Sequence, residues 1–201
     1  MQSFINHARG FPAAIAGRRA QFAELANGQE PQALFVSCSD SRVMPSLFTG
    51  AQPGEVFELR TAGNIVPPYE PRAVCAVGAT LEFALEALAV PDIVICGHSH
   101  CGAVQGLLRR DKVRRMPLVR DWLTRAGHRD KTSDKTSDDT ETDLSAAIQH
   151  HLLVQVDHLR TYPIVAAALA EGRLRLHAWF YTVETGEVLA HNPATAAFQP
   201  L

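Results

Sequence analysis

Two stretches decide the fold of this chain: ALFVSC at residues 33–38 and DIVICGHSHCG at residues 92–102. Each begins with a short apolar run, which is typical of a strand covered on both faces of a parallel sheet. Each also ends in reactive side chains, which are Cys38 in the first stretch and His98 and Cys101 in the second. Clusters of polar residues just beyond strand ends indicate an open sheet whose functional site lies at its carboxyl edge.

Strand and helix patterns alternate around these stretches, which predicts an α/β fold. The chain, residues 1–201, is expected to form a single domain with a mainly parallel central β-sheet flanked by helices. Apolar spacing and turn signals predict helices at 12–25, 71–88, 144–159 and 163–171, and further strands at 55–59, 174–181 and 187–190. Residues 130–143, DKTSDKTSDDTETD, contain no apolar residue, so this segment is predicted to be a disordered loop insertion.

Composition narrows the class of protein. The 19 Lys and Arg residues nearly balance the 21 Asp and Glu residues, so the surface as a whole has no electrostatic reason to bind nucleic acid or an anionic membrane. A small substrate is expected instead. The N-terminus shows no secretory signal and no segment is apolar for long enough to span a membrane, so we expect a cytoplasmic protein. In that reducing compartment the four cysteines are metal ligands or buried thiols rather than disulfides.

The reactive side chains at the two strand ends fit a zinc site. Catalytic zinc usually takes three protein ligands and keeps a fourth position open, and Cys38, His98 and Cys101 offer such a set. The alternative is that the cysteines are simply small buried residues, as most free cysteines are. Cys75, within a helical pattern, and Cys96, within an apolar strand, fit that alternative and are not assigned to the metal.

Asp40 and Arg42 follow Cys38 directly. A planar guanidinium can hold a carboxylate through two parallel hydrogen bonds, so Arg42 can keep Asp40 ionised and oriented near the metal. The alternative is an ordinary surface ion pair, which contributes roughly 0–1 kcal/mol. The position beside a candidate ligand favours a functional pair.

Three motifs together resemble the signatures of the β-class carbonic anhydrases: CSDSRV at 38–43, RTAGN at 60–64 and GHSHCGA at 97–103. The stretches 153–165 and 177–188 are similar to the family's C-terminal part. The resemblance implies one Zn²⁺ per subunit, held by Cys38, His98 and Cys101. It also implies reversible hydration of carbon dioxide to bicarbonate and a proton, by attack of zinc-bound hydroxide oriented by Asp40 and Arg42. In some members the aspartate instead occupies the fourth zinc position.

The resemblance also suggests a substrate pocket, formed by Gln29, Phe57, Ala62, Phe83 and Gly102. A tyrosine is usual in the family at the position of Phe83. For Gln29, the alternative that it is an ordinary exposed loop residue has equal weight. A homodimer or a higher even-numbered homo-oligomer is implied, with the N-terminal helix extending to a partner subunit. Two alternatives stay open: hydrolysis of carbon disulfide or carbonyl sulfide on the same scaffold, and a non-catalytic zinc-containing binding protein.

Overall fold

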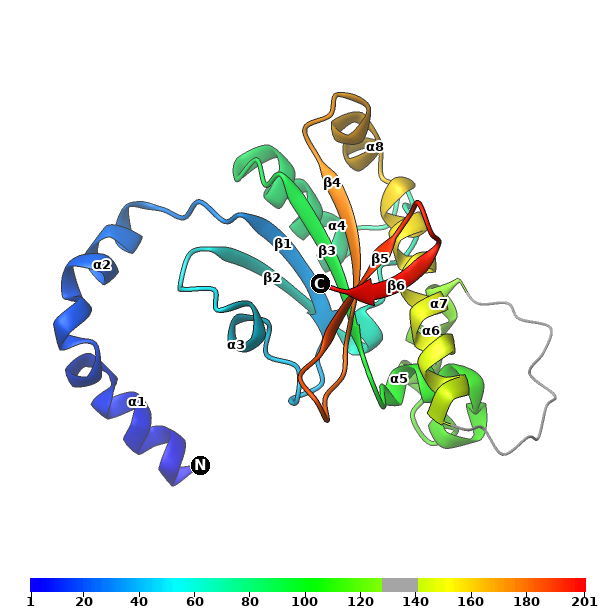
Figure 1. Ribbon diagram of the computed structural model, residues 1–201, viewed down its shortest axis with the longest axis horizontal. Helices are drawn as coiled ribbons and strands as arrows, with labels where there is room; N and C mark the ends of the chain where they lie inside the picture. The colour runs from blue at the N-terminus through cyan, green and yellow to red at the C-terminus, as the bar shows by residue number, and fades with distance from the viewer. Residues whose placement is uncertain (128–140) are drawn as a thin grey trace.

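A six-stranded sheet organises the fold, with the strand order β2-β1-β3-β4-β5-β6 (Figure 1). The structure, a computed structural model, describes residues 1–127 and 141–201, without the side chains of 141–143. The first four strands of that order are parallel, and the last two pairings are antiparallel. The strands are β1 (Ala33–Cys38), β2 (Val56–Thr61), β3 (Asp92–His98), β4 (Arg175–Tyr181), β5 (Val188–Asn192) and β6 (Ala197–Pro200). The predicted α/β class with a mainly parallel sheet is confirmed.

The position of β1 explains where a site can form. The chain leaves β1 for β2 on one side and later returns to β3 on the other, so the sheet reverses its direction of growth at β1. Segments that follow β1 and β3 therefore diverge, and in open α/β sheets this point accommodates ligands beyond the carboxyl ends of the strands. Ser37 of β1 lies opposite Cys96 of β3, so the ends of both strands are level.

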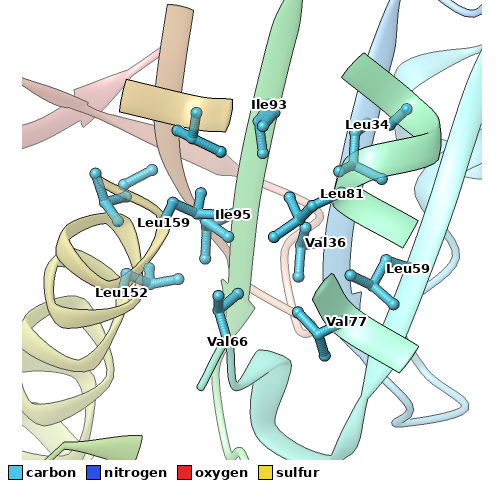
Figure 2. Packing of buried hydrophobic residues seen from close by; sticks show 14 of the residues in the cluster. Leu34, Val36, Leu59, Val66, Val77, Leu81, Ile93, Ile95, Leu152 and Leu159 are labelled. Carbon is cyan, nitrogen blue, oxygen red and sulfur yellow. The ribbon is translucent and has the colours of Figure 1, made fainter. Parts of the chain in front are cut away.

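Both faces of β1 and β3 are covered, which is why these strands are continuously apolar. On one face, alternate residues of the two strands pack against the helices α4 (Ala76–Glu82), α7 (Glu141–Arg160) and α8 (Pro163–Ala170). Figure 2 shows this core, with Leu34 and Val36 of β1 beside Leu81 of α4, and Ile95 of β3 beside Leu152 of α7. On the opposite face, Phe35 packs edge-on against Phe48 of the short helix α3 (Pro45–Thr49).

Two helices that the sequence patterns did not predict follow β3. Helices α5 (Gly102–Leu108) and α6 (Pro117–Leu123) pack with the turn that follows β2. They enclose a second, smaller core, formed by Ile65, Val113, Leu123 and Ala126. The segment after the second strand end is thereby fixed against the body of the protein.

The N-terminal part forms an arm that extends away from the sheet (Figure 1). It consists of α1 (Gln2–Ala14) and α2 (Arg19–Glu24), separated by a 3₁₀ turn, and no residue of either helix is buried. The predicted single helix at 12–25 is therefore wrong in its bounds. Neither helix has a side that faces a core, so burial does not set the spacing of the apolar residues. The sequence pattern therefore could not show where the helices begin and end.

Other predicted boundaries changed less. Helix α4 begins at Ala76 and continues into a π-helical turn at Phe83–Ala87, within the predicted span 71–88. Helix α7 begins at Glu141, three residues before its predicted start. The rest of the predicted loop insertion, residues 130–140, lies outside the described residues. Among the described residues, no helix is both long and apolar enough to cross a membrane.

Replacing Leu152 by alanine should destabilise the protein, because its fully buried side chain joins α7 to the sheet. We expect the free energy of unfolding to fall by about 2–5 kcal/mol in urea denaturation. Asp157→Ala on the same helix is the matched control. Its exposed ion pair with Arg160 contributes less than about 1 kcal/mol, so equal effects of the two changes would contradict the packing described here.

Candidate metal centre

The structure brings together the three residues that the sequence singled out as ligands. The ligand atoms of Cys38, His98 and Cys101 all lie within 4.8 Å of one another, and all three residues are buried. Cys38 ends β1, His98 ends β3, and Cys101 directly precedes α5. Within residues 1–127 and the described part beyond 140, this is the one group of three or more such side chains with that spacing.

The imidazole of His98 is oriented for metal binding. Its Nδ1 lies 2.9 Å from the carbonyl oxygen of Ser99, to which it donates, so Nε2 carries the lone pair. Nε2 is buried and has no hydrogen-bond partner in the structure. An unpaired buried polar atom is costly, and a metal ion coordinated by Nε2 and two thiolates would satisfy it. The donor set and this orphaned nitrogen therefore fit zinc.

The two thiols of this group share a hydrogen bond. Hydrogen bonding with Cys101 lowers the pKa of the Cys38 thiol, and the same contact together with burial raises the pKa of Cys101. The backbone N–H of Gly63 also donates to Cys38 Sγ at 3.3 Å, which further favours the thiolate. Because a metal binds thiolates, loading the site must release the proton that this pair holds.

The Asp40–Arg42 pair is present and lies beside the cysteine–histidine group. Arg42 donates to both carboxylate oxygens, at 2.9 and 2.7 Å, and its backbone N–H adds a third bond at 3.0 Å. The Arg42 guanidinium holds the pKa of Asp40 well below its usual range. Asp40 Oδ2 lies 3.8 Å from His98 Nε2, so the ionised carboxylate borders the space that the ligand atoms share.

Arg60 supports the loop that carries Cys38 and Asp40, a role that the sequence analysis missed. Its guanidinium donates to the carbonyl oxygens of Cys38, Asp40 and Val43, at 2.8, 2.8 and 2.7 Å. Three backbone acceptors of one short loop thus converge on a single side chain from β2. No sequence signal other than its place in RTAGN could have indicated this, because the acceptors are backbone atoms.

The turn after β2 is fixed from the other side by polar residues of α7. His151 Nε2 lies 2.8 Å from the carbonyl oxygen of Gly63, and Gln155 accepts a bond from the backbone N–H of Val66 at 3.0 Å. Both side chains are buried. Helix α7 therefore holds the turn whose Gly63 N–H meets Cys38 Sγ.

The predicted pocket residues divide into two groups. Ala62 immediately precedes Gly63, and Gly102 immediately follows Cys101, so both adjoin the candidate ligands, and both are exposed. Phe57 and Phe83 instead pair with each other, with ring centroids 5.9 Å apart. Phe57 lies four residues before Thr61, the partner of Cys38, which puts it about 13 Å back along β2 at about 3.3 Å per residue.

Gln29 belongs with the second group, since it precedes Ala33, the first residue of β1, which lies about 16 Å along the strand from Cys38 at about 3.3 Å per residue. One copy of the chain thus brings two of the five predicted pocket residues to the candidate metal centre. Cys75 and Cys96 lie outside the ligand group. Cys75 caps α4 through a bond from Gly78 N, and Cys96 is fully buried in β3.

Comparisons with known proteins agree with this geometry. The family model described as "Carbonic anhydrase" matches residues 33–188. A carbonic anhydrase from Synechocystis is 43% identical over 89% of this chain and 66% of its own length. One from Pseudomonas aeruginosa is 42% identical over 94% of this chain and 86% of its own length. The chain thus spans slightly less than two thirds of the length of the cyanobacterial relative.

Solved structures also match this chain, and they too are carbonic anhydrases. The structure of the beta-carbonic anhydrase CcaA has a TM-score of 0.91 and 39% identity, and covers 100% of this chain and 99% of its own. Tetrameric beta-carbonic anhydrases from Sordaria macrospora give a TM-score of 0.77 at 29% identity, over 94% of this chain and 96% of theirs. These matches extend over the sheet and over the segments that carry the candidate ligands.

Gly63→Ala should weaken zinc binding as well as stability. Gly63 has φ 75°, and an added Cβ would lie 2.7 Å from the Cβ of Ala103, so the turn must shift and carry its N–H away from Cys38. Gly172→Ala is the matched control, since Gly172 has φ 69° but open space around it. The control should cost about 1–2 kcal/mol of backbone strain and leave zinc affinity unchanged.

In Gly63→Ala, the clash with Ala103 should lower the free energy of unfolding by about 1–3 kcal/mol more than the backbone strain alone. Urea denaturation and zinc titration of both variants measure the two effects. Unchanged zinc affinity in Gly63→Ala would rule out a contribution of this turn to the site.

Proposed function

The chain belongs to the β-class carbonic anhydrase family, and on this premise we propose that it catalyses the reversible hydration of carbon dioxide to bicarbonate and a proton. One observation carries the proposal: an ionised carboxylate, Asp40, lies 3.8 Å from the unpartnered Nε2 of His98, within a buried Cys-His-Cys group. A purely structural zinc site has four protein ligands and no need of a neighbouring carboxylate fixed by an arginine.

Cys38, His98 and Cys101 are the proposed ligands of one Zn²⁺ per subunit. Zinc bound by three protein ligands supplies a Lewis acid that makes a coordinated water ionise near neutral pH. Neighbouring residues set the tautomer and the charge of these ligands. Ser99 fixes the tautomer of His98, and the N–H of Gly63 stabilises the charge on Cys38.

Asp40 is the proposed orienting residue for the reacting water. Its carboxylate can accept a hydrogen bond from that water and so direct an oxygen lone pair toward carbon dioxide. Arg42 keeps the carboxylate ionised and engages both of its oxygens. Because both oxygens are engaged by Arg42, Asp40 would not be available as a fourth zinc ligand in this arrangement, and a water could take that position.

The remaining pocket residues are proposed to act between subunits of an even-numbered homo-oligomer. Ala62 and Gly102 adjoin the ligands of their own chain, whereas Gln29, Phe57 and Phe83 do not reach them. Phe83 is 49% exposed, and the arm formed by α1 and α2 buries no residue in its own chain. We therefore propose that these residues and the arm pack against a neighbouring copy, where the phenylalanines would line an apolar path for carbon dioxide.

No nucleic acid or membrane partner is proposed. The near balance of basic and acidic residues supports this, and the lack of any disulfide among the four cysteines supports a cytoplasmic location.

Carbon dioxide hydration measured by stopped flow tests the proposal. The zinc-loaded protein should accelerate hydration strongly over buffer, and Cys38→Ala should abolish that acceleration because a ligand is lost. Sulfide release from carbonyl sulfide, measured in parallel, tests the alternative substrate. Hydration no faster than in the Cys38→Ala variant would refute the proposed function, and sulfide release without hydration would replace it by the sulfur substrate.

Asp40→Asn should separate catalysis from metal binding. The amide keeps the shape of the side chain but loses its charge, so we expect kcat/KM to fall by about 10²–10⁴-fold, the range of general acid–base catalysis. Zinc content should stay at one ion per chain. Asp157→Asn, at an exposed position of α7, is the control and should match the unmodified protein. If Asp40→Asn retained full activity, the role given to Asp40 would be wrong.

A further inference from the structure

Glu184 lies in the turn between β4 and β5, yet its carboxylate contacts the loop that carries two of the proposed ligands. Oε2 accepts a hydrogen bond from the hydroxyl of Ser99 at 2.8 Å, and Oε1 accepts one from Nε2 of His100. Ser99 and His100 are the two residues between His98 and Cys101. A single carboxylate therefore holds both residues that link the ligands.

The contact with Ser99 leads to the imidazole of His98. The Ser99 carbonyl accepts from His98 Nδ1, and its hydroxyl both donates to Glu184 and accepts from the backbone N–H of Val183 at 3.0 Å. The Ser99 N–H donates to the Tyr181 carbonyl at 2.9 Å. The residue that fixes the tautomer of His98 is thus itself held by the β4–β5 turn.

The contact with His100 leads to the Asp40–Arg42 pair. His100 has φ 55°, a left-handed backbone conformation that is unfavourable for a residue with a side chain. In this conformation its carbonyl accepts a bond from Arg42 Nη2 at 3.3 Å. By binding the His100 ring, Glu184 helps to fix the backbone carbonyl that accepts the bond from Arg42. Arg42 in turn donates to both carboxylate oxygens of Asp40.

We propose that Glu184 is a positioning residue of the metal centre, acting through Ser99 on the proposed ligand His98 and through His100 on Arg42. Its catalytic consequence rests on the proposed function, whereas its effect on metal affinity does not. Hydrogen bonds to a carboxylate are stronger than neutral ones. Direct outer partners of metal ligands typically contribute 10–100-fold to metal affinity or activity, and Glu184 acts on one such partner, Ser99.

A purely structural role for Glu184 in closing its turn is a weaker explanation. The turn has its own backbone bonds, from Thr182 N to Glu187 O and from Gly186 N to Thr182 O, both at 2.8 Å. Gly186 supplies the positive φ of 77° that the turn requires. The side chain of Glu184 is also 44% exposed, so its ion pair adds little to overall stability.

The test compares Glu184→Ala with Glu187→Ala, which removes a carboxylate from the same turn without touching the ligand loop. Zinc affinity is measured by competition with a chromophoric chelator, and ligand geometry by the visible absorption spectrum of the Co²⁺-substituted protein. We expect Glu184→Ala to bind zinc about 10-fold more weakly, the lower end of the effect of a direct partner of a ligand, and to change the Co²⁺ spectrum. Glu187→Ala should match the unmodified protein in both measurements.

Two further variants keep the test decisive. Ser99→Ala should weaken zinc binding in the same direction, and the double variant with Glu184→Ala should lose less than the sum of the single losses, because both act along one path. Glu184→Gln keeps an acceptor for Ser99 and should fall between Glu184→Ala and the unmodified protein. In carbon dioxide hydration by Glu184→Ala, the loss of activity should appear mostly as a lower kcat, with KM little changed.

Zinc affinity and a Co²⁺ spectrum in Glu184→Ala equal to those of Glu187→Ala would overturn the proposal. Fully additive losses in the double variant would also overturn the path through Ser99. If the unmodified protein does not hydrate carbon dioxide, the proposed function fails, while the zinc affinities of these variants still decide the role of Glu184.

Discussion

The parallel pairing of β1 with β3 is the constraint on which the rest of the structure depends. Because Ser37 lies opposite Cys96, the two strands end at the same level, and the side chains that follow them converge. Cys38 and His98 lie at the ends of strands that are buried on both faces, so neither residue can move without disturbing the core. A rigid sheet edge of this kind suits a metal site, which requires ligand positions that are fixed before the metal binds.

Beyond the strand ends, the site depends on side chains that bind backbone atoms. Arg60 from β2 holds the loop after β1, His151 and Gln155 from α7 hold the turn after β2, and Glu184 from the β4–β5 turn contacts the loop after β3. Each irregular segment near the candidate ligands is thus supported by a different element. Irregular loops that are supported in this way by a rigid scaffold can keep Asp40 and the candidate ligands at fixed distances from one another.

The sequence predicted the elements whose patterns report burial. The apolar residues of β1, β3 and α7 face a core, so their patterns predict these elements. The candidate ligands are predicted because they lie at or just beyond the ends of two of these strands, and they are Cys38, His98 and Cys101. The breaks of the N-terminal arm were not predicted, since no residue of α1 or α2 is buried and the apolar spacing had no core to follow. The helices α5 and α6 were missed as well, because they are short and cover only a small separate core.

By itself the sequence determined the kind of chemistry: two thiols, an imidazole and a carboxylate–guanidinium pair at strand ends, in spacings set by short local segments. Only the tertiary structure decided which groups are partners across the chain. Glu184 is 85 residues from Ser99, and Arg60 binds carbonyl groups that every residue possesses, so neither contact leaves a pattern in the sequence. The distance of Phe57 from Cys38 was likewise decided by the register of β1 and β2, because strand pairing fixes positions that spacing along the chain does not.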